Sequence, residues 1–163
     1  MDLDHITELE QRYNSAGERT LGQAYEALLN RFEHGSRDRE TSLRLMFLAW
    51  YSCSEPSFLT GLPEDDPGCP MPGVFRAAFE ELGGELSEDP ELLFTAGLMA
   101  SMFPYCCGPA HEWSAIGTAL KSRYAALPAA ERMTESAFVG RGAYGNYFAH
   151  MVRVHSGASR EQS

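Results

Sequence analysis

The segment of residues 89–117 constrains the fold most. It begins with Asp89-Pro90-Glu91 and continues through residues 92–102 as an apolar run without a charged residue. A turn over residues 103–109, rich in proline and cysteine, interrupts the run before a second periodic segment opens at residue 111. Acidic residues ahead of an apolar run favour a helix N-terminus, and Pro with Gly favours a turn. The segment therefore predicts a buried helix, a sharp turn and a second helix that folds back on the first.

Helical periodicity recurs along the rest of the chain. Apolar residues return every three to four positions, and no stretch alternates convincingly with the period of two typical of a strand. The pattern predicts an all-α protein of about six to seven helices in antiparallel hairpins. Segments 39–53 and 88–102 carry apolar residues on more than one face, which predicts that both are mostly buried. The expected helices cover residues 3–13, 18–34, 39–53, 73–82, 88–102, 113–127 and 135–154, and the proline-rich residues 63–73 are expected to form a loop.

Length and composition indicate one globular domain. The chain has 163 residues, of which 44% are apolar and 22% charged, ordinary values for a folded protein of one domain. We expect a single all-α domain over residues 1–155 and a flexible tail over residues 156–163, where small and polar residues gather.

The charge balance indicates which classes of partner the protein can bind. A formal net charge of −10, with 13 basic against 23 acidic residues, disfavours binding to the phosphate backbone of nucleic acids but suits a basic protein. No apolar run reaches the roughly 18 residues that a membrane span needs. Residues 1–5 are acidic where a secretory signal would be basic. The sequence therefore predicts a cytoplasmic protein that binds neither nucleic acid nor membrane.

Two segments carry a repeat-like pattern. Trp113-x2-Ile116-Gly117-x2-Leu120 and Leu21-Gly22-x2-Tyr25 resemble the first helix of the tetratricopeptide repeat, which reads W-x2-L-G-x2-Y. The resemblance implies a binding scaffold without chemistry of its own, and an irregular helical bundle is the alternative. The helices expected to pair are residues 18–32 with 39–53, 73–82 with 91–103, and 113–127 with 135–151.

Cys106-Cys107-x3-His111 is the group in the sequence whose residue types most suggest metal binding or catalysis. A structural zinc site needs four ligands, and adjacent cysteines are poorly placed to chelate one ion together. A nucleophilic Cys with a His base is the other chemical interpretation, but free cysteines are among the most buried residues of proteins. We expect reduced thiols that pack in the core or the turn, with no metal and no cofactor.

Residues 140–145 match the glycine pattern G-x-G-x-x-G of dinucleotide-binding proteins. That motif needs a preceding strand and a following βα unit, and the 18 residues after Gly145 leave no room for one. The pattern instead predicts a helix on which Gly142, Gly145 and Ala149 form a flat stripe for another helix.

Three functional hypotheses follow. The first is a non-enzymatic protein-interaction scaffold, an adaptor or an inhibitor of a basic partner, that uses an acidic face near residues 80–91 or the exposed sides of the first helices in each pair. The second is a small-ligand-binding protein or an enzyme with an interhelical pocket, and the third is a homodimer subunit. The candidate partner-binding residues are Gln23, Glu26, Arg76, Glu80, Glu81, Glu85 and Lys121. The candidate pocket residues are Trp50, Tyr51, Glu55, Tyr105, Cys106, His111, Arg141 and Tyr144.

Overall fold

The computed structural model describes residues 1–64 and 71–161, without the side chains of residues 71, 72 and 157–161. All regular secondary structure in this part of the chain is helical, which confirms the all-α prediction. The α-helices are α1 (Leu3–Ala16), α2 (Leu21–Glu33), α3 (Arg39–Ser54), α4 (Ser57–Thr60), α5 (Met71–Glu81), α6 (Pro90–Met102), α7 (Ala110–Ala125) and α8 (Gly142–Glu161). The 3-10 turns are η1 (Gly84–Leu86), η2 (Pro104–Cys106), η3 (Ala129–Glu131) and η4 (Glu135–Phe138).

Aspartates begin three of the helices. The side chains of Asp2, Asp38 and Asp89 accept hydrogen bonds from backbone N–H groups in the first turns of α1, α3 and α6. An aspartate in this position satisfies a donor that has no partner within the helix. The caps explain why α3 and α6 begin where the sequence changes from polar to apolar.

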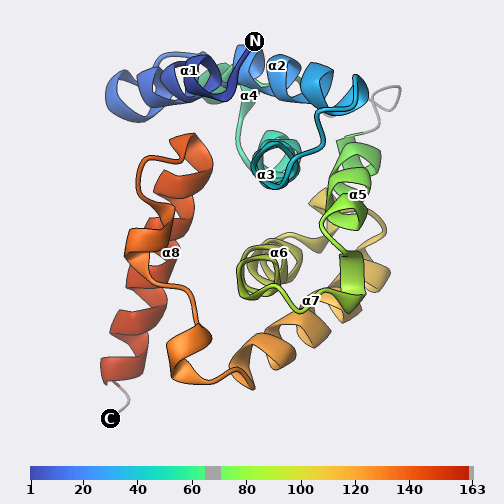
Figure 1. Ribbon diagram of the computed structural model, residues 1–163, viewed down its shortest axis with the longest axis vertical. Coiled ribbons are helices and arrows are strands. Elements are labelled where there is room, and N and C mark those ends of the chain that lie inside the picture. The colour runs from blue at the N-terminus through green and yellow to red at the C-terminus, as the bar shows by residue number, and fades with distance from the viewer. Residues whose placement is uncertain (65–70, 162–163) are drawn as a thin grey trace.

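Helices α3 and α6 form the centre of the bundle. Figure 1 shows both nearly end-on, surrounded by α1 and α2 above, α5 and α7 on one side and below, and α8 on the other side. Every residue from 41 to 50 in α3 and from 91 to 100 in α6 is buried. This confirms the prediction from apolar residues on more than one face, because only a helix covered all round can bury such a sequence.

The helices pair differently from the repeat-like prediction. The α2–α3 pair forms as expected, but α5 packs mainly on α3, α6 on α7, and α8 on α1. The pairs expected between 73–82 and 91–103 and between 113–127 and 135–151 are therefore not the main contacts. Since α3 and α6 are apolar on several faces, each receives more than one neighbour, and the contact of α1 with α8 closes the ring of outer helices.

The small residues of the repeat-like pattern do lie at close contacts. A Cβ on Gly117 would come within 3.0 Å of the Ala100 side chain in α6, and one on Gly22 within 2.1 Å of the Gly61 carbonyl oxygen. Trp113 is fully buried, with Phe75 and Phe79 against it. Large and small residues thus have the packing roles that the pattern predicted, although the pairing of helices is different.

The last predicted helix divides into two parts. Residues 135–138 form η4, and α8 begins only at Gly142 after a turn in which Gly140 and Gly142 have φ of 75° and 67°. A Cβ on Gly142 would meet the side chains of Glu10 in α1 and Arg44 in α3, and one on Gly145 would meet the Phe138 carbonyl oxygen in η4 at 2.2 Å. The helix continues to Glu161, beyond the tail boundary expected at residue 156.

Within the described residues, no helix is both long and apolar enough to cross a membrane.

Candidate functional site

A network of ion pairs crosses the interior between α1, α3, α6 and the start of α8. Arg44 pairs with Glu10, and their side chains are only 3% and 0% exposed. Arg141 donates hydrogen bonds to Glu40, from Nη2 to Oε2 at 2.6 Å, and to Glu91. We call these five residues the buried ion network. It joins four helices through charges held largely out of water, where their interaction is much stronger than at a surface.

The electrostatics of the buried ion network indicate a structural role. Burial, with a smaller contribution from Arg141, lowers the pKa of Arg44 to about 10. Burial also acts to lower the pKa of Arg141, but its hydrogen bonds to Glu91 and Glu40 outweigh this and raise the pKa. Both guanidinium groups therefore stay charged at neutral pH. Burial raises the pKa of the neighbouring Tyr144 well above its usual value, so this phenol stays neutral.

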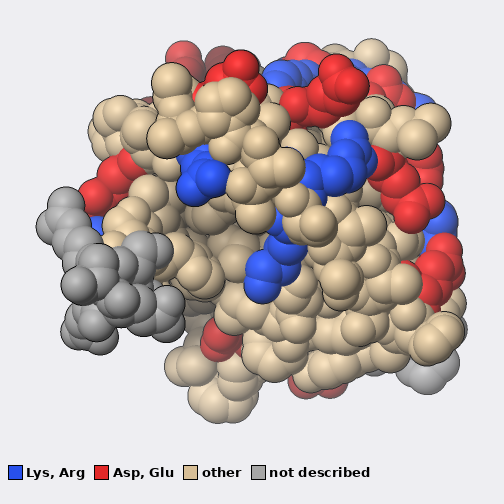
Figure 2. Space-filling view, turned by 90° about the horizontal axis from the view of Figure 1, so that it is seen from below, with Lys and Arg blue, Asp and Glu red and all other residues tan. Residues whose placement is uncertain are grey.

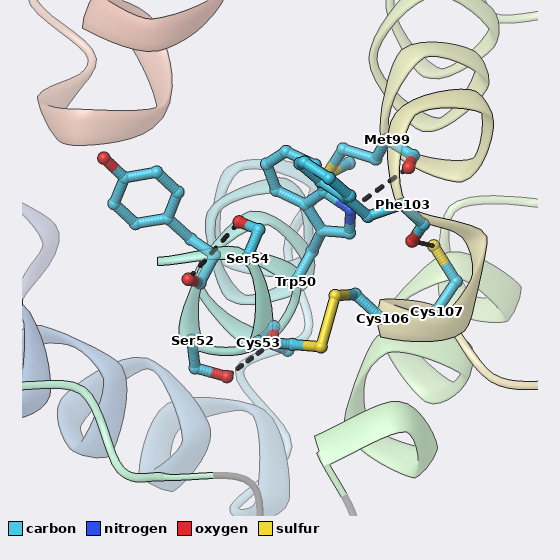
Figure 3. Close-up of a disulfide and its surroundings, with 10 residues drawn as sticks. Trp50, Ser52, Cys53, Ser54, Met99, Phe103, Cys106 and Cys107 are labelled. Atoms are coloured by element: carbon cyan, nitrogen blue, oxygen red, sulfur yellow. Dashed lines mark hydrogen bonds between the residues drawn. A yellow bond between two sulfur atoms is a disulfide. The ribbon is translucent and has the colours of Figure 1, made fainter. Parts of the chain in front are cut away.

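Cys53 at the end of α3 and Cys106 in η2 form a disulfide, with their Cα atoms 5.5 Å apart (Figure 3). The expectation that all thiols are reduced is therefore wrong for these two residues. Cys107 is a buried free thiol, and burial raises its pKa, so it lacks the thiolate character of a reactive cysteine. Cys69 lies outside the described residues. Within them, no three His, Cys, Asp or Glu side chains are grouped to hold a metal ion.

The residues expected to line an interhelical pocket lie in different surroundings. Trp50 and Cys106 are each 1% exposed, and the Trp50 indole donates its hydrogen bond to the Met99 carbonyl oxygen at 3.1 Å. The Tyr51 hydroxyl lies 3.1 Å from that of Tyr13. The remaining candidates are scattered: Glu55 is half-buried, Tyr105 and His111 are exposed, and Arg141 and Tyr144 lie at the buried ion network. The large rings among these candidates pack in the core, as rings at a helix end often do, and the interhelical pocket stays a prediction.

The residues expected to bind a partner lie on three separate parts of the molecule. Gln23 and Glu26 line a groove of about 460 Å³ beside α2, together with Arg19 and Pro63. Arg76 lies 5.1 Å above the Trp113 ring and pairs with Glu112. Glu80, Glu81 and Glu85 lie on α5 and η1, and Lys121 lies on α7. Figure 1 places α2, α5 and α7 around the bundle.

The acidic candidates lie together on one exposed segment. Glu80, Glu81, Glu85 and Glu88 are exposed, and Leu86 among them is 90% exposed. We call these five residues the acidic ridge. The acidic residues Asp65 and Asp66, which the sequence adds to this patch, lie outside the described residues.

The backbone of the acidic ridge is held in place. Gly83 and Gly84 have φ of 106° and 62°, a conformation that glycine adopts without strain. The Arg123 guanidinium donates hydrogen bonds to the carbonyl oxygens of Glu85 and Ser87. Leu86 is therefore presented to solvent on a fixed turn.

Sequence reasoning missed a groove between α6, α7 and α8. Its volume is about 340 Å³, and we call it the cationic groove. Its lining residues are Leu93, Phe94, Leu98, Lys121, Tyr124, Ala125, Arg132 and His155. The face in Figure 2 is hollowed and largely uncharged, and the charged side chains nearest the hollow are Lys or Arg. The one available signal in the sequence was Lys121, the only lysine of the chain.

Comparison with known proteins finds no relative of this chain. No protein-family model, curated protein or solved structure matches this chain. The function is therefore inferred from the surfaces and sites described above.

Proposed function

We propose that this protein is a non-enzymatic interaction scaffold that binds a basic protein partner through the acidic ridge. The observation that carries the proposal is the 90% exposure of Leu86 on a turn flanked by glutamates. Protein interfaces commonly have an apolar centre and a polar rim. Leu86 with the surrounding glutamates has this composition. The partner that complements this surface is a basic protein with an apolar pocket for Leu86.

The charges around Leu86 favour this class of partner. Only Glu81 of the ridge glutamates forms an ion pair with a described residue, Arg37, at 3.6 Å. The others are available to attract a basic surface, which increases the rate of encounter and selects against acidic proteins. Because the turn is held by Arg123, little conformational freedom is lost on binding, and this favours affinity.

The proposed role is the one that the resemblance to tetratricopeptide repeats implies. The hairpins α2–α3 and α6–α7 support the exposed segments much as repeat helices support a binding surface. No observation favours the alternative of a ligand pocket around Trp50, Tyr51, Cys106 and His111. A homodimer is the competing arrangement, and it would appear in solution as twice the chain mass of 18.0 kDa.

The acidic ridge is tested by a variant with Glu80→Gln, Glu85→Gln and Leu86→Ser. A protein that the wild type captures from extract of its own cells at low salt should bind this variant at least about tenfold more weakly, because hot-spot and charge contacts are lost together. Binding of the purified partner by calorimetry at two salt concentrations measures the change, and high salt should weaken wild-type binding.

The matched control for the ridge variant carries Glu8→Gln, Glu33→Gln and Val139→Ser. These residues are exposed, and Val139 is 75% exposed, so the control loses the same charge and a similar apolar area elsewhere. It should bind like the wild type. Equal weakening in both variants, an acidic partner, or an affinity indifferent to salt would each overturn the proposal.

The proposed setting is the cytoplasm, and the state of Cys53 and Cys106 in the cell tests it. Cytosolic thiol systems keep most disulfides reduced. A cytoplasmic setting requires the Cys53–Cys106 bond of the structure to be open in the cell, so all four cysteines of the chain should then be alkylated when cells are quenched with acid and denatured with an alkylating reagent. The purified, air-oxidised protein should take up two fewer labels. Mass spectrometry counts the labels, and a protein already oxidised in quenched cells would contradict a cytoplasmic setting.

A further inference from the structure

The Lys and Arg side chains that lack a carboxylate partner are distributed unevenly on this acidic protein. Among the Lys and Arg residues whose side chains are described, most form ion pairs with carboxylates, such as Arg31 with Asp38 and Arg153 with Glu135. The cations without a carboxylate partner are Arg19, Lys121, Arg123 and Arg132. Three of these four lie on the second half of α7 or shortly after it, and two line the cationic groove.

The two groove cations have charge available for a ligand. Arg132 donates from Nε to the Leu127 carbonyl oxygen at 3.2 Å and from Nη2 to the Ala125 carbonyl oxygen at 2.8 Å. These bonds fix its guanidinium at the C-terminal end of α7, while Nη1 has no acceptor among the described residues. Lys121 has neither an ion pair nor a hydrogen bond to a described residue, and its stem lies against Gly97, where a Cβ would be 3.1 Å from the Lys121 Cγ atom.

The floor of the cationic groove is apolar and fixed. Leu93, Phe94 and Leu98 of α6 are 2%, 7% and 6% exposed. The Tyr124 hydroxyl accepts a hydrogen bond from the Met133 backbone N–H at 2.8 Å, and its ring packs on Phe94 with centroids 5.2 Å apart. Among the side chains that the structure describes, no carboxylate lines the groove. Apolar walls with a few polar groups at one side are typical of small-molecule sites.

We propose that the cationic groove binds a small amphipathic carboxylate, with the acid group at Lys121 and Arg132 and a medium-length apolar chain against Phe94, Leu98 and Tyr124. The groove volume of about 340 Å³ lies at the low end for ligand sites, which suits a chain of about ten carbons. The two cations attract a carboxylate, whereas they do not attract a neutral or cationic amphiphile. The site shares no residue with the acidic ridge and does not depend on the proposed protein partner.

The single lysine of the chain makes a specific test possible. Reductive methylation with ¹³C-formaldehyde labels only Lys121 and the N-terminal amine, and it keeps their charge. Addition of decanoate at submicellar concentration should shift the Lys121 methyl resonance in a saturable manner and leave the N-terminal resonance in place. Decyltrimethylammonium, with the same chain and the opposite charge, should cause no saturable shift. A Lys121 resonance unmoved by millimolar decanoate, or moved equally by both compounds, would overturn the proposal.

Substitution separates the groove from general charge effects. Lys121→Met keeps an apolar stem and removes the cation, and it should weaken decanoate binding in calorimetry about tenfold or more, since a charge-assisted contact is lost. Arg19→Met is the matched control, because Arg19 also lacks a carboxylate partner but lines the groove beside α2. It should leave decanoate affinity unchanged. Equal losses in both variants would contradict the proposal.

A lipid surface is the other source of an anionic head with apolar chains. Sedimentation with phosphatidylglycerol vesicles tests it with the same two variants. We expect no Lys121-dependent association with vesicles. Association that requires Lys121, combined with no response to free decanoate, would assign the groove to a membrane surface and refute a soluble ligand.

Discussion

Replacement of Arg44 with Met is expected to lower the free energy of unfolding by about 3–5 kcal/mol, the usual cost of leaving one charge of a buried pair unpaired. The Glu10 side chain is fully buried and lies between Arg44 and Gly142. Without Arg44 it must stay ionised without its main partner or take up a proton. Urea unfolding followed by the fluorescence of Trp50 and Trp113, both buried, measures the loss.

The double variant Glu10→Met, Arg44→Met is the matched control. Removal of both charges leaves no unpaired ion, and such replacements are often neutral or stabilising. It should therefore recover most of the stability that Arg44→Met loses. If the single and double variants were equally unstable, the loss would come from packing around Arg44, and the electrostatic account of the buried ion network would be wrong.

Loss of the Cys53–Cys106 disulfide is expected to lower the free energy of unfolding of the oxidised protein by about 4 kcal/mol. The bond spans a sequence separation of 53 residues, and closing a loop of this length restricts the unfolded chain by about that amount in the chain-entropy model. The measurement compares the urea midpoint of the wild type with and without reductant. Reduction should shift the midpoint to lower urea.

Two variants make the disulfide experiment specific. Cys53→Ala should be as unstable as the reduced wild type and should no longer respond to reductant. Cys107→Ala removes the neighbouring buried thiol and should still respond. If Cys53→Ala retained the sensitivity to reductant, another pair of cysteines would be the bonded one.

The sequence predicted the centre of the fold better than its connections. The apolar faces of residues 39–53 and 88–102 correctly predicted that α3 and α6 are buried, and the structure shows Asp38 as the cap of α3. The same apolar character made the packing partners ambiguous, because a helix that is apolar all round has no single face that selects a neighbour. This is why the contacts of α5 with α3 and of α8 with α1 were missed.

The charged and sulfur-containing groups of the interior were not predictable for a different reason. Glu40, Glu91 and Arg141 each resemble ordinary surface residues within their own segments, and only the fold brings them together. The partner of Cys106 could not be chosen among the cysteines, since sequence alone does not determine disulfide connectivity. Lys121 was identified as a surface candidate, but the apolar floor beneath it comes from α6, a distant part of the sequence.

The contact between α1 and α8 has a consequence for biosynthesis. Helix α1 has its main partners in α2, its neighbour in the chain, and in α8, far along the chain. Gly142 at the start of α8 covers the Glu10–Arg44 pair. A chain emerging from the ribosome can assemble α2 on α3 and α6 on α7 through short-range contacts, but the side of α1 that faces α8 stays uncovered until α8 itself has been made. Exposed apolar surface of this kind is what chaperones recognise in unfinished chains, so α1 is the segment of this protein that most needs protection during synthesis.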